Sequence, residues 1–120
     1  YGLVGSEMCI RDSVFLSGTA SINNKGEVVH VGNIVKQTER MWENVGVLLE
    51  EGGASFDDVM QIIVYLRDVC DYPTVKEMFA RRFPDTPKVI TLAPVCRPTW
   101  LIEMECIAVK KRCNEKYRDF

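Results

Sequence analysis

The sequence has no Cys-x-x-Cys pair, a single histidine, no apolar run long enough to span a bilayer and no excess of basic residues. Five cysteines without paired spacing argue against a structural zinc site and a secreted disulfide framework. With 15 Lys and Arg against 17 Asp and Glu, the chain lacks a broad basic field for binding nucleic-acid phosphates. We therefore expect a cytoplasmic protein that has no metal, cofactor, membrane or nucleic-acid partner and acts on a small molecule.

The chain of 120 residues, 47% hydrophobic, is long enough for one domain with an ordinary core. Its start does not read as a signal peptide, because it has no basic n-region, apolar h-region or small-residue cleavage site. The run EMCIRD at residues 7–12 resembles one reading frame of the transposase mosaic-end adapter used for sequencing libraries. We therefore predict that residues 1–13 are a translated cloning scar; the alternative is a genuine, poorly patterned N-terminus.

From residue 14 onward the chain alternates strand and helix signals. Apolar periodicity, turn residues and capping residues predict the following elements: a hairpin of 14–22 with 28–31 around an Asn-Asn-Lys-Gly turn, a helix over 33–51, a capping box at Ser55 and Asp58, a strand over 60–67, a helix over 71–83, and strands over 88–93 and 100–109 joined by a Pro-Val-Cys-Arg-Pro hairpin loop. This order predicts an α+β fold, in which two helices pack on one face of a mixed sheet.

Several of these segments resemble the reactive intermediate deaminase (Rid, or YjgF) family over residues 14–109. The resemblance rests on the order and spacing of FLSGT at 15–19, Gln37, Asn44-Val45, Leu48-Leu49, Gly52-Gly53, Asp58-Val59, VYL at 64–66, Asp68 and IEMECIA at 102–108. It implies a fold similar to chorismate mutase, a homotrimer with an inner barrel, and ligand clefts between subunits. It also implies hydrolysis of enamines and imines derived from amino acids to 2-keto acids and ammonia.

The same resemblance sets the expected boundaries of the domain. We predict a Rid-like domain over 14–110 that lacks the family's first strand, with its Gly-Pro-Tyr segment, because scar sequence stands before residue 14. Residues 111–120 are predicted to form a basic tail. Lys110 to Phe120 contains five basic residues, which favours a solvated terminal run over RNA contact.

Two glutamates near the C-terminus are candidates for the chemistry. Hydrolysis of an imine needs a water aimed at the imine carbon, which a carboxylate can hold and deprotonate. Period two puts Glu103 and Glu105 on one face of their strand, about 7 Å apart. By position, Glu103 resembles the family's water-positioning glutamate. The alternative is that both glutamates pair with basic side chains such as Arg67 or face solvent.

The chain departs from the family at the arginine that binds the substrate carboxylate. That position falls on Lys88 or Pro87, and a lysine offers a flexible point charge rather than a planar fork. Arg97, in the loop between the last two strands, is the nearest arginine in sequence; its alternative role is that of a solvated turn residue. We therefore predict a divergent subgroup, with Glu103, Lys88 and Arg97 as candidate catalytic residues.

A second set of residues is assigned to substrate binding: Ser17, Gly18, Thr19, Cys96 and Glu105. Gly18 resembles the family glycine that lets the backbone approach the ligand, and its alternative is a bulge or strand bend. Cys96 and Cys106 carry no activating motif, so we interpret them as small packing residues rather than nucleophiles.

Three functions remain to be weighed. The leading hypothesis is enamine or imine hydrolysis at an intersubunit cleft of a homotrimer. The runner-up is a non-catalytic module that binds a small carboxylate such as a keto acid, as one domain of a longer tandem protein. The third is RNA cleavage, which some family members were described as performing.

Overall fold

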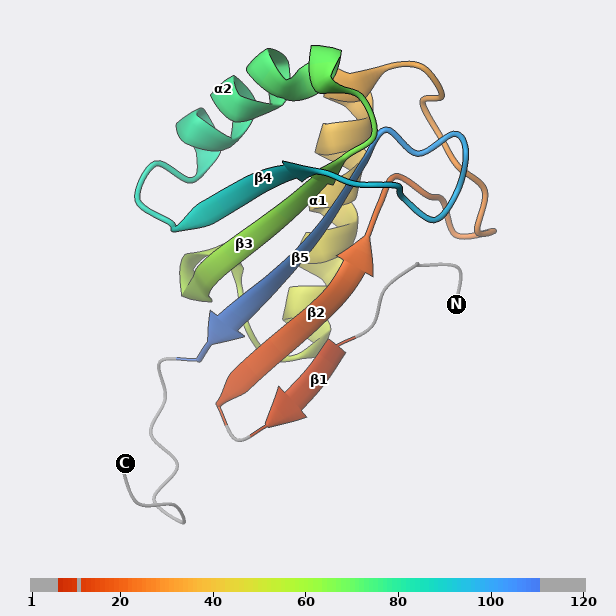
Figure 1. The fold of residues 1–120 in the computed structure, drawn as a ribbon. Helices are drawn as coiled ribbons and strands as arrows, with labels where there is room; N and C mark the ends of the chain where they lie inside the picture. The colour runs from red at the N-terminus through yellow and green to blue at the C-terminus, as the bar shows by residue number, and fades with distance from the viewer. Residues whose placement is uncertain (1–6, 11, 111–120) are drawn as a thin grey trace.

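The computed structural model describes residues 7–10 and 12–110. Its elements in chain order are β1 (Glu7–Ile10), β2 (Ser13–Thr19), α1 (Ile34–Glu51), β3 (Val59–Leu66), α2 (Tyr72–Arg82), β4 (Lys88–Leu92) and β5 (Ile102–Val109), with short 3-10 turns at Phe56–Asp58 and Val69–Asp71. The five strands form one sheet in the order β1-β2-β5-β3-β4 (Figure 1). The predicted α+β class and mixed sheet are confirmed.

The sheet topology differs from the sequence prediction at its last two strands. β3 lies between β4 and β5; it pairs parallel with β4 and antiparallel with β5. The segment 93–101 is therefore not a hairpin loop but a connection that passes the end of β3. The reason lies in α2, because a helix between β3 and β4 is the crossover that two parallel neighbouring strands require.

One face of the sheet carries the core, and both helices cover it. Alternate residues of β3 and β5 are buried there, among them Ile62, Val64 and Cys106. Asn33 caps α1 by accepting a hydrogen bond from the backbone N–H of Lys36 at 3.0 Å. The opposite face, called the open face below, carries the other residues of each strand: Phe15, Ser17, Ile63, Tyr65, Val89, Thr91, Glu103, Glu105, Ile107 and Val109.

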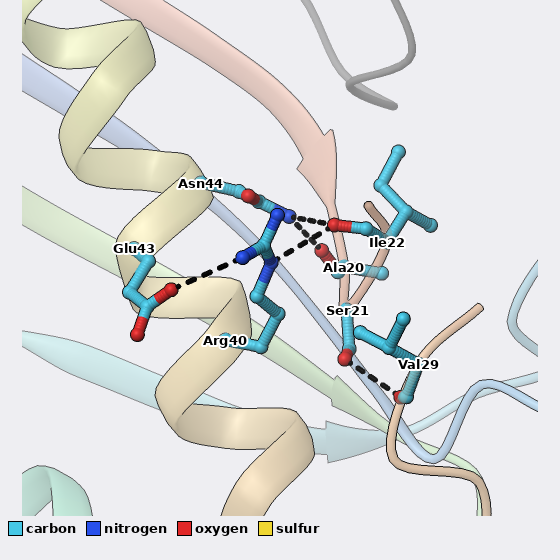
Figure 2. A network of polar contacts seen from close by, with 7 residues as sticks. All are labelled: Ala20, Ser21, Ile22, Val29, Arg40, Glu43 and Asn44. Carbon is cyan, nitrogen blue, oxygen red and sulfur yellow. Dashed lines mark hydrogen bonds and ion pairs between the residues drawn. The ribbon is translucent and has the colours of Figure 1, made fainter. Parts of the chain in front are cut away.

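The predicted hairpin of 14–22 with 28–31 forms only in part. β2 ends at Thr19, and beyond it the hairpin continues through an isolated bridge between Ile22 and Val28 and through backbone hydrogen bonds from Val29 to Ser21 and from Asn23 to Glu27. Figure 2 shows how this segment is attached to α1. Asn44 of α1 donates to the carbonyls of Ala20 and Ile22 at 2.9 and 3.0 Å, so these two backbone groups bond to the helix.

Arg40 strengthens this attachment of residues 20–22 to α1. Its Nε donates to the Ile22 carbonyl at 3.0 Å, and its Nη1 pairs with Glu43 at 3.3 Å (Figure 2). Most of the helical stripe predicted for α1 is buried as expected, although Val35 is 40% exposed, and two polar residues, Gln37 and Asn44, are buried with it. Their amides are satisfied by the neighbouring loops, since Gln37 donates to Thr99 and accepts from the backbone N–H of Leu101.

At the N-terminal edge, residues 7–10 form β1, which pairs antiparallel with β2. An edge strand is thus present beside β2, where we expected the family's first strand to be lacking. Whether these residues derive from an adapter stays a prediction, because the pairing does not depend on their origin. The predicted basic tail at 111–120 lies outside the described residues.

Candidate functional site

The candidate site begins with an irregularity in β2. Leu16 pairs with Cys106 and Thr19 with Met104, so three residue steps on β2 oppose two on β5. This mismatch is a β-bulge at Ser17-Gly18. Because bulges redirect the backbone locally, this one brings the main chain of β2 toward the side chains of β5 on the open face.

Gly18 lies directly against the carboxylate of Glu103. A Cβ built at residue 18 would be 2.0 Å from Glu103 Oε1, far closer than any contact a real side chain makes. Gly18 does not have a positive φ, so glycine is needed here for space rather than for backbone conformation. The alternative interpretation of Gly18 as a bulge is therefore confirmed, whereas its approach to a ligand stays a prediction.

The carboxyl of Glu103 has unusual electrostatics. Burial, and then the negative charge of Glu105, raise its pKa above the ordinary value, because both disfavour the ionised form. Glu105 is in turn fixed by Tyr65, whose hydroxyl donates to Glu105 Oε1 at 2.7 Å. A half-buried carboxyl with a raised pKa is better suited than an ordinary glutamate to take a proton and return it.

Arg67 does not pair with these glutamates, so the alternative in which it neutralises them is wrong. Its Nε donates to the Trp100 carbonyl at 2.7 Å, and its Nη2 donates to the carbonyls of Val95 and Arg97. Of the ion pairs formed by the described residues, none involves Glu103 or Glu105. Arg67 therefore holds the 93–101 connection, and the two carboxylates are left on the open face without a cation of their own.

Lys88 lies away from Glu103. It pairs with Ile62, which pairs with Cys106, and cross-strand partners share a face, so Lys88 belongs to the helix-covered face. Its Nζ donates to the carbonyls of Phe83 and Thr86 at 2.8 and 3.2 Å, just after α2. It lines a hollow of about 520 Å³ between α2 and the start of β4. Within one chain, Lys88 and Glu103 cannot contact the same small substrate.

Arg97 lies at the same end of the sheet as Glu103. Its Nη1 donates to the Gly26 carbonyl at 2.5 Å, and its guanidinium stacks over the ring of Trp100 with 5.4 Å between guanidinium carbon and ring centre. Trp100 precedes β5, whose second residue is Glu103. Arg97 is therefore a fixed, half-buried residue rather than the solvated turn residue that was its alternative.

The remaining predicted residues divide between the two faces. Ser17 is exposed at the bulge, beside Gly18. Thr19 is fully buried, and its hydroxyl donates to the Ser17 carbonyl at 3.0 Å, so it braces the bulge rather than facing a ligand. Cys96 is exposed in the 93–101 connection, which differs from its predicted role as a small packing residue; Cys106 is buried in the core as expected.

Sequence reasoning did not single out Tyr65 or Asn44 as part of the site. The alternation in β3 places Tyr65 on the open face of the sheet, but only the register with β5 shows that it faces Glu103 and Glu105.

In the described part of the chain, no group of three or more His, Cys, Asp or Glu side chains is arranged to hold a metal ion. No described helix is long and apolar enough to cross a membrane.

Comparison with known proteins fits this arrangement. A family profile described as endoribonuclease L-PSP matches residues 5–110. The chain belongs to this family, which is also called the Rid or YjgF family. A RutC family protein of Pyrococcus abyssi is 38% identical to this Rid protein over 105 residues, which is 85% of this chain and 82% of the relative.

Two further relatives extend the comparison. The 3-aminoacrylate deaminase RutC of Acinetobacter baylyi is 31% identical over 97 residues, covering 79% of this chain and 77% of the relative. The crystal structure of a Thermotoga maritima MSB8 protein superposes with a TM-score of 0.79 at 31% identity, over 89% of this chain and 86% of that one. The Rid fold predicted from the sequence is therefore confirmed.

Proposed function

We propose that this Rid protein hydrolyses an enamine or imine derived from an amino acid, releasing ammonia and a 2-keto acid. The observation that carries the proposal is the position of the Glu103 carboxylate, which lies half-buried on the open face against the backbone of Gly18. The deaminase activity named for the Acinetobacter relative supports the same class of reaction.

The proposed mechanism uses Glu103 first as a base and then as an acid. Glu103 takes a proton from a water whose oxygen attacks the imine carbon, and the electron pair of the C=N bond moves to nitrogen. The protonated Glu103 then gives its proton to that nitrogen. Glu103, ionised again, then transfers the hydroxyl proton to the amine nitrogen as the remaining C–N bond breaks, so that ammonia leaves and the keto group forms. A raised pKa suits both steps, because it makes the Glu103 carboxylate a stronger base and lets the protonated carboxyl persist to higher pH than an ordinary glutamate.

A substrate with a carboxylate also needs a cation. Arg97 is the better candidate within one chain, because it lies at the Glu103 end of the sheet and is held in place by Gly26 and Trp100. Lys88 is on the other face, so it would serve Glu103 only if it came from a neighbouring copy. A guanidinium binds a carboxylate with two parallel hydrogen bonds, which favours Arg97 on chemical grounds as well.

The open face supports the predicted homotrimer. Phe15, Val89 and Val109 of this face are 37%, 57% and 41% exposed, and the glutamates stand among them. Contact with further copies would bury these apolar side chains and enclose the site. Light scattering on the purified protein should give the mass of three chains, and a monomer at micromolar concentration would contradict the assembly.

We also propose a cytoplasmic setting, because exposed free thiols such as those of Cys70 and Cys96 persist in a reducing compartment.

The decisive experiment measures ammonia release from an imine generated in situ from an amino acid. We expect Glu103→Gln to lower kcat by about 10²- to 10⁴-fold, the usual contribution of a general base. Glu39→Gln, an exposed change on α1, is the matched control and should retain wild-type activity. Equal rates for wild type and Glu103→Gln would remove Glu103 from the mechanism.

Two more variants locate the cation. We expect Arg97→Gln to raise KM for carboxylate substrates by about 10-fold or more, whereas Lys88→Gln has this effect only if the cleft lies between copies. If no turnover occurs with any imine but keto acids bind in calorimetry, the protein is instead a carboxylate-binding module.

A further inference from the structure

Tyr65 stands opposite one glutamate of the pair and bonds to the other. In the register of β3 with β5, Tyr65 is the partner of Glu103, and Ile63 is the partner of Glu105. The Tyr65 hydroxyl nevertheless donates to Glu105 Oε1 at 2.7 Å, along the diagonal of the strand pair. The Tyr65 side chain therefore extends past Glu103 to Glu105, and the Glu103 carboxylate does not receive this hydrogen bond.

The ring of Tyr65 is held by packing as well as by β3. It packs against a small apolar cluster that is separate from the main core and consists of Ala20, Ile22, Val95 and Trp100, with Val28 at its margin. Because an aromatic side chain has only two rotatable bonds, this contact determines where its hydroxyl lies. The position of Glu105 is thus coupled to the loops on both sides of the site.

Few charged groups face this pair from the neighbouring elements. On the open face, β2 contributes Ser17 and Gly18, and β4 contributes Val89 and Thr91, none of which titrates in the ordinary range. Arg67 lies one row beyond Tyr65 and is engaged by three backbone carbonyls. The local electrostatics are therefore set by Tyr65 and the two glutamates.

The phenol of Tyr65 fixes the position of its partner. An ionised carboxylate only accepts hydrogen bonds, so the Tyr65 O–H, as a donor, holds the Glu105 side chain in place beside Glu103. The hydrogen bond to Glu105, together with burial and the charges of both glutamates, raises the pKa of Tyr65, which keeps the phenol protonated and able to donate.

We propose that Tyr65 is a positioning residue that holds Glu105 as the fixed charge of the pair, so that Glu103 is the carboxyl that exchanges protons during turnover. The two glutamates, which are equivalent by strand periodicity, thereby take different roles. This inference rests on the proposed hydrolysis, but the division of roles is a property of the folded protein and is measurable without substrate.

The first test is an NMR titration of the Glu103 side-chain carboxyl. Glu105→Gln should lower the titration midpoint of Glu103, because it removes the neighbouring charge. Tyr65→Phe should lower it as well, by a smaller amount, because Glu105 loses the donor that holds its side chain beside Glu103. In the double variant the Glu103 midpoint should equal that of Glu105→Gln, since Tyr65 acts only through Glu105.

Tyr72→Phe is the control, because it removes the hydroxyl of a tyrosine on α2. If Tyr65→Phe shifts the Glu103 midpoint no more than Tyr72→Phe does, or if its effect persists in full beside Glu105→Gln, the proposal is overturned. Thermal unfolding of each variant identifies a general loss of structure. A Tyr65→Phe protein that remains folded but shows no shift counts against the proposal.

The second test is the pH profile of kcat/KM for imine hydrolysis. Tyr65→Phe and Glu105→Gln should move its acidic limb to lower pH and lower kcat at neutral pH by about 3- to 10-fold, far less than Glu103→Gln. If no variant or wild type hydrolyses an imine, the proposed function fails while the titration still decides the role of Tyr65. If hydrolysis occurs and both profiles coincide with wild type, the role of Tyr65 fails alone.

Discussion

The backbone of Gly18 and the carboxylate of Glu103 occupy adjoining space that leaves no room for a side chain at residue 18. The first residue comes from β2 and the second from β5, and the β-bulge between Leu16 and Thr19 brings them together. The contact links the geometry of the sheet to the carboxyl on which the proposed chemistry depends.

Replacing Gly18 by alanine should therefore displace Glu103 rather than unfold the domain. The methyl group would meet the far end of a flexible side chain, so we expect a loss of stability of about 1 kcal/mol or less. Activity should fall by about 10²-fold, as a shift of about 1 Å in a reacting group can produce. The measurement is kcat together with urea unfolding of Gly18→Ala; full activity in this variant would separate Gly18 from the site.

Glu103→Gln should make the protein more stable at neutral pH while reducing its activity. The pKa of Glu103 in the folded protein is raised above its ordinary value of 4.5, so the folded state favours the protonated form. This contribution is fully present below the ordinary value and is lost as the pH rises through the raised one. The variant, which cannot ionise, should have the higher Tm at pH 7, and the difference should vanish near pH 4.

This prediction has a clear control and a clear contradiction. Glu39→Gln, made at an exposed position of α1, should give a Tm difference that does not follow the same pH dependence. A Glu103→Gln protein that melts below wild type at pH 7 would show that the ionised carboxylate stabilises the fold, contrary to the raised pKa.

Cys106 should resist alkylation in the folded protein. Burial, followed by the charge of Glu105, raises the pKa of its thiol to about 12, so almost none of it is thiolate at pH 8. Cys96 is exposed and should react. Mass-spectrometric mapping after iodoacetamide treatment should find Cys106 modified only in urea; rapid modification under native conditions would show that β5 opens readily.

Asn44→Ala should destabilise the domain by about 2 to 4 kcal/mol. The buried amide donates to the carbonyls of Ala20 and Ile22, and its removal deprives Ala20 of this donor, leaves Ile22 with Arg40 alone and creates a cavity. Urea unfolding measures the effect. Glu43→Ala is the control, because its ion pair with Arg40 is exposed and should contribute about 0.5 kcal/mol or less. Equal losses for the two variants would show that residues 20–22 do not depend on Asn44.

Much of this protein is determined locally by its sequence. The helix over residues 34–51 follows from its apolar stripe, its asparagine cap and the glycines after it, and the strands follow from alternation. Period two alone puts Glu103 and Glu105 on one face, because successive side chains of a strand point to opposite sides. The sequence motifs also identified the family, since their order and spacing are visible in the sequence without knowledge of the contacts.

Pairing between distant segments was decided only by the tertiary structure. Lys88 stands near the family's arginine position in sequence, yet its register with β3 puts it on the face opposite Glu103. The expected hairpin is reduced to a single bridge with a few backbone hydrogen bonds, and Asn44 attaches it to α1 through contacts that local propensity does not reveal. Tyr65 became part of the site through its register with β5. Alternation fixes which residues of one strand share a face, whereas register and buried hydrogen bonds fix which residues of different strands meet.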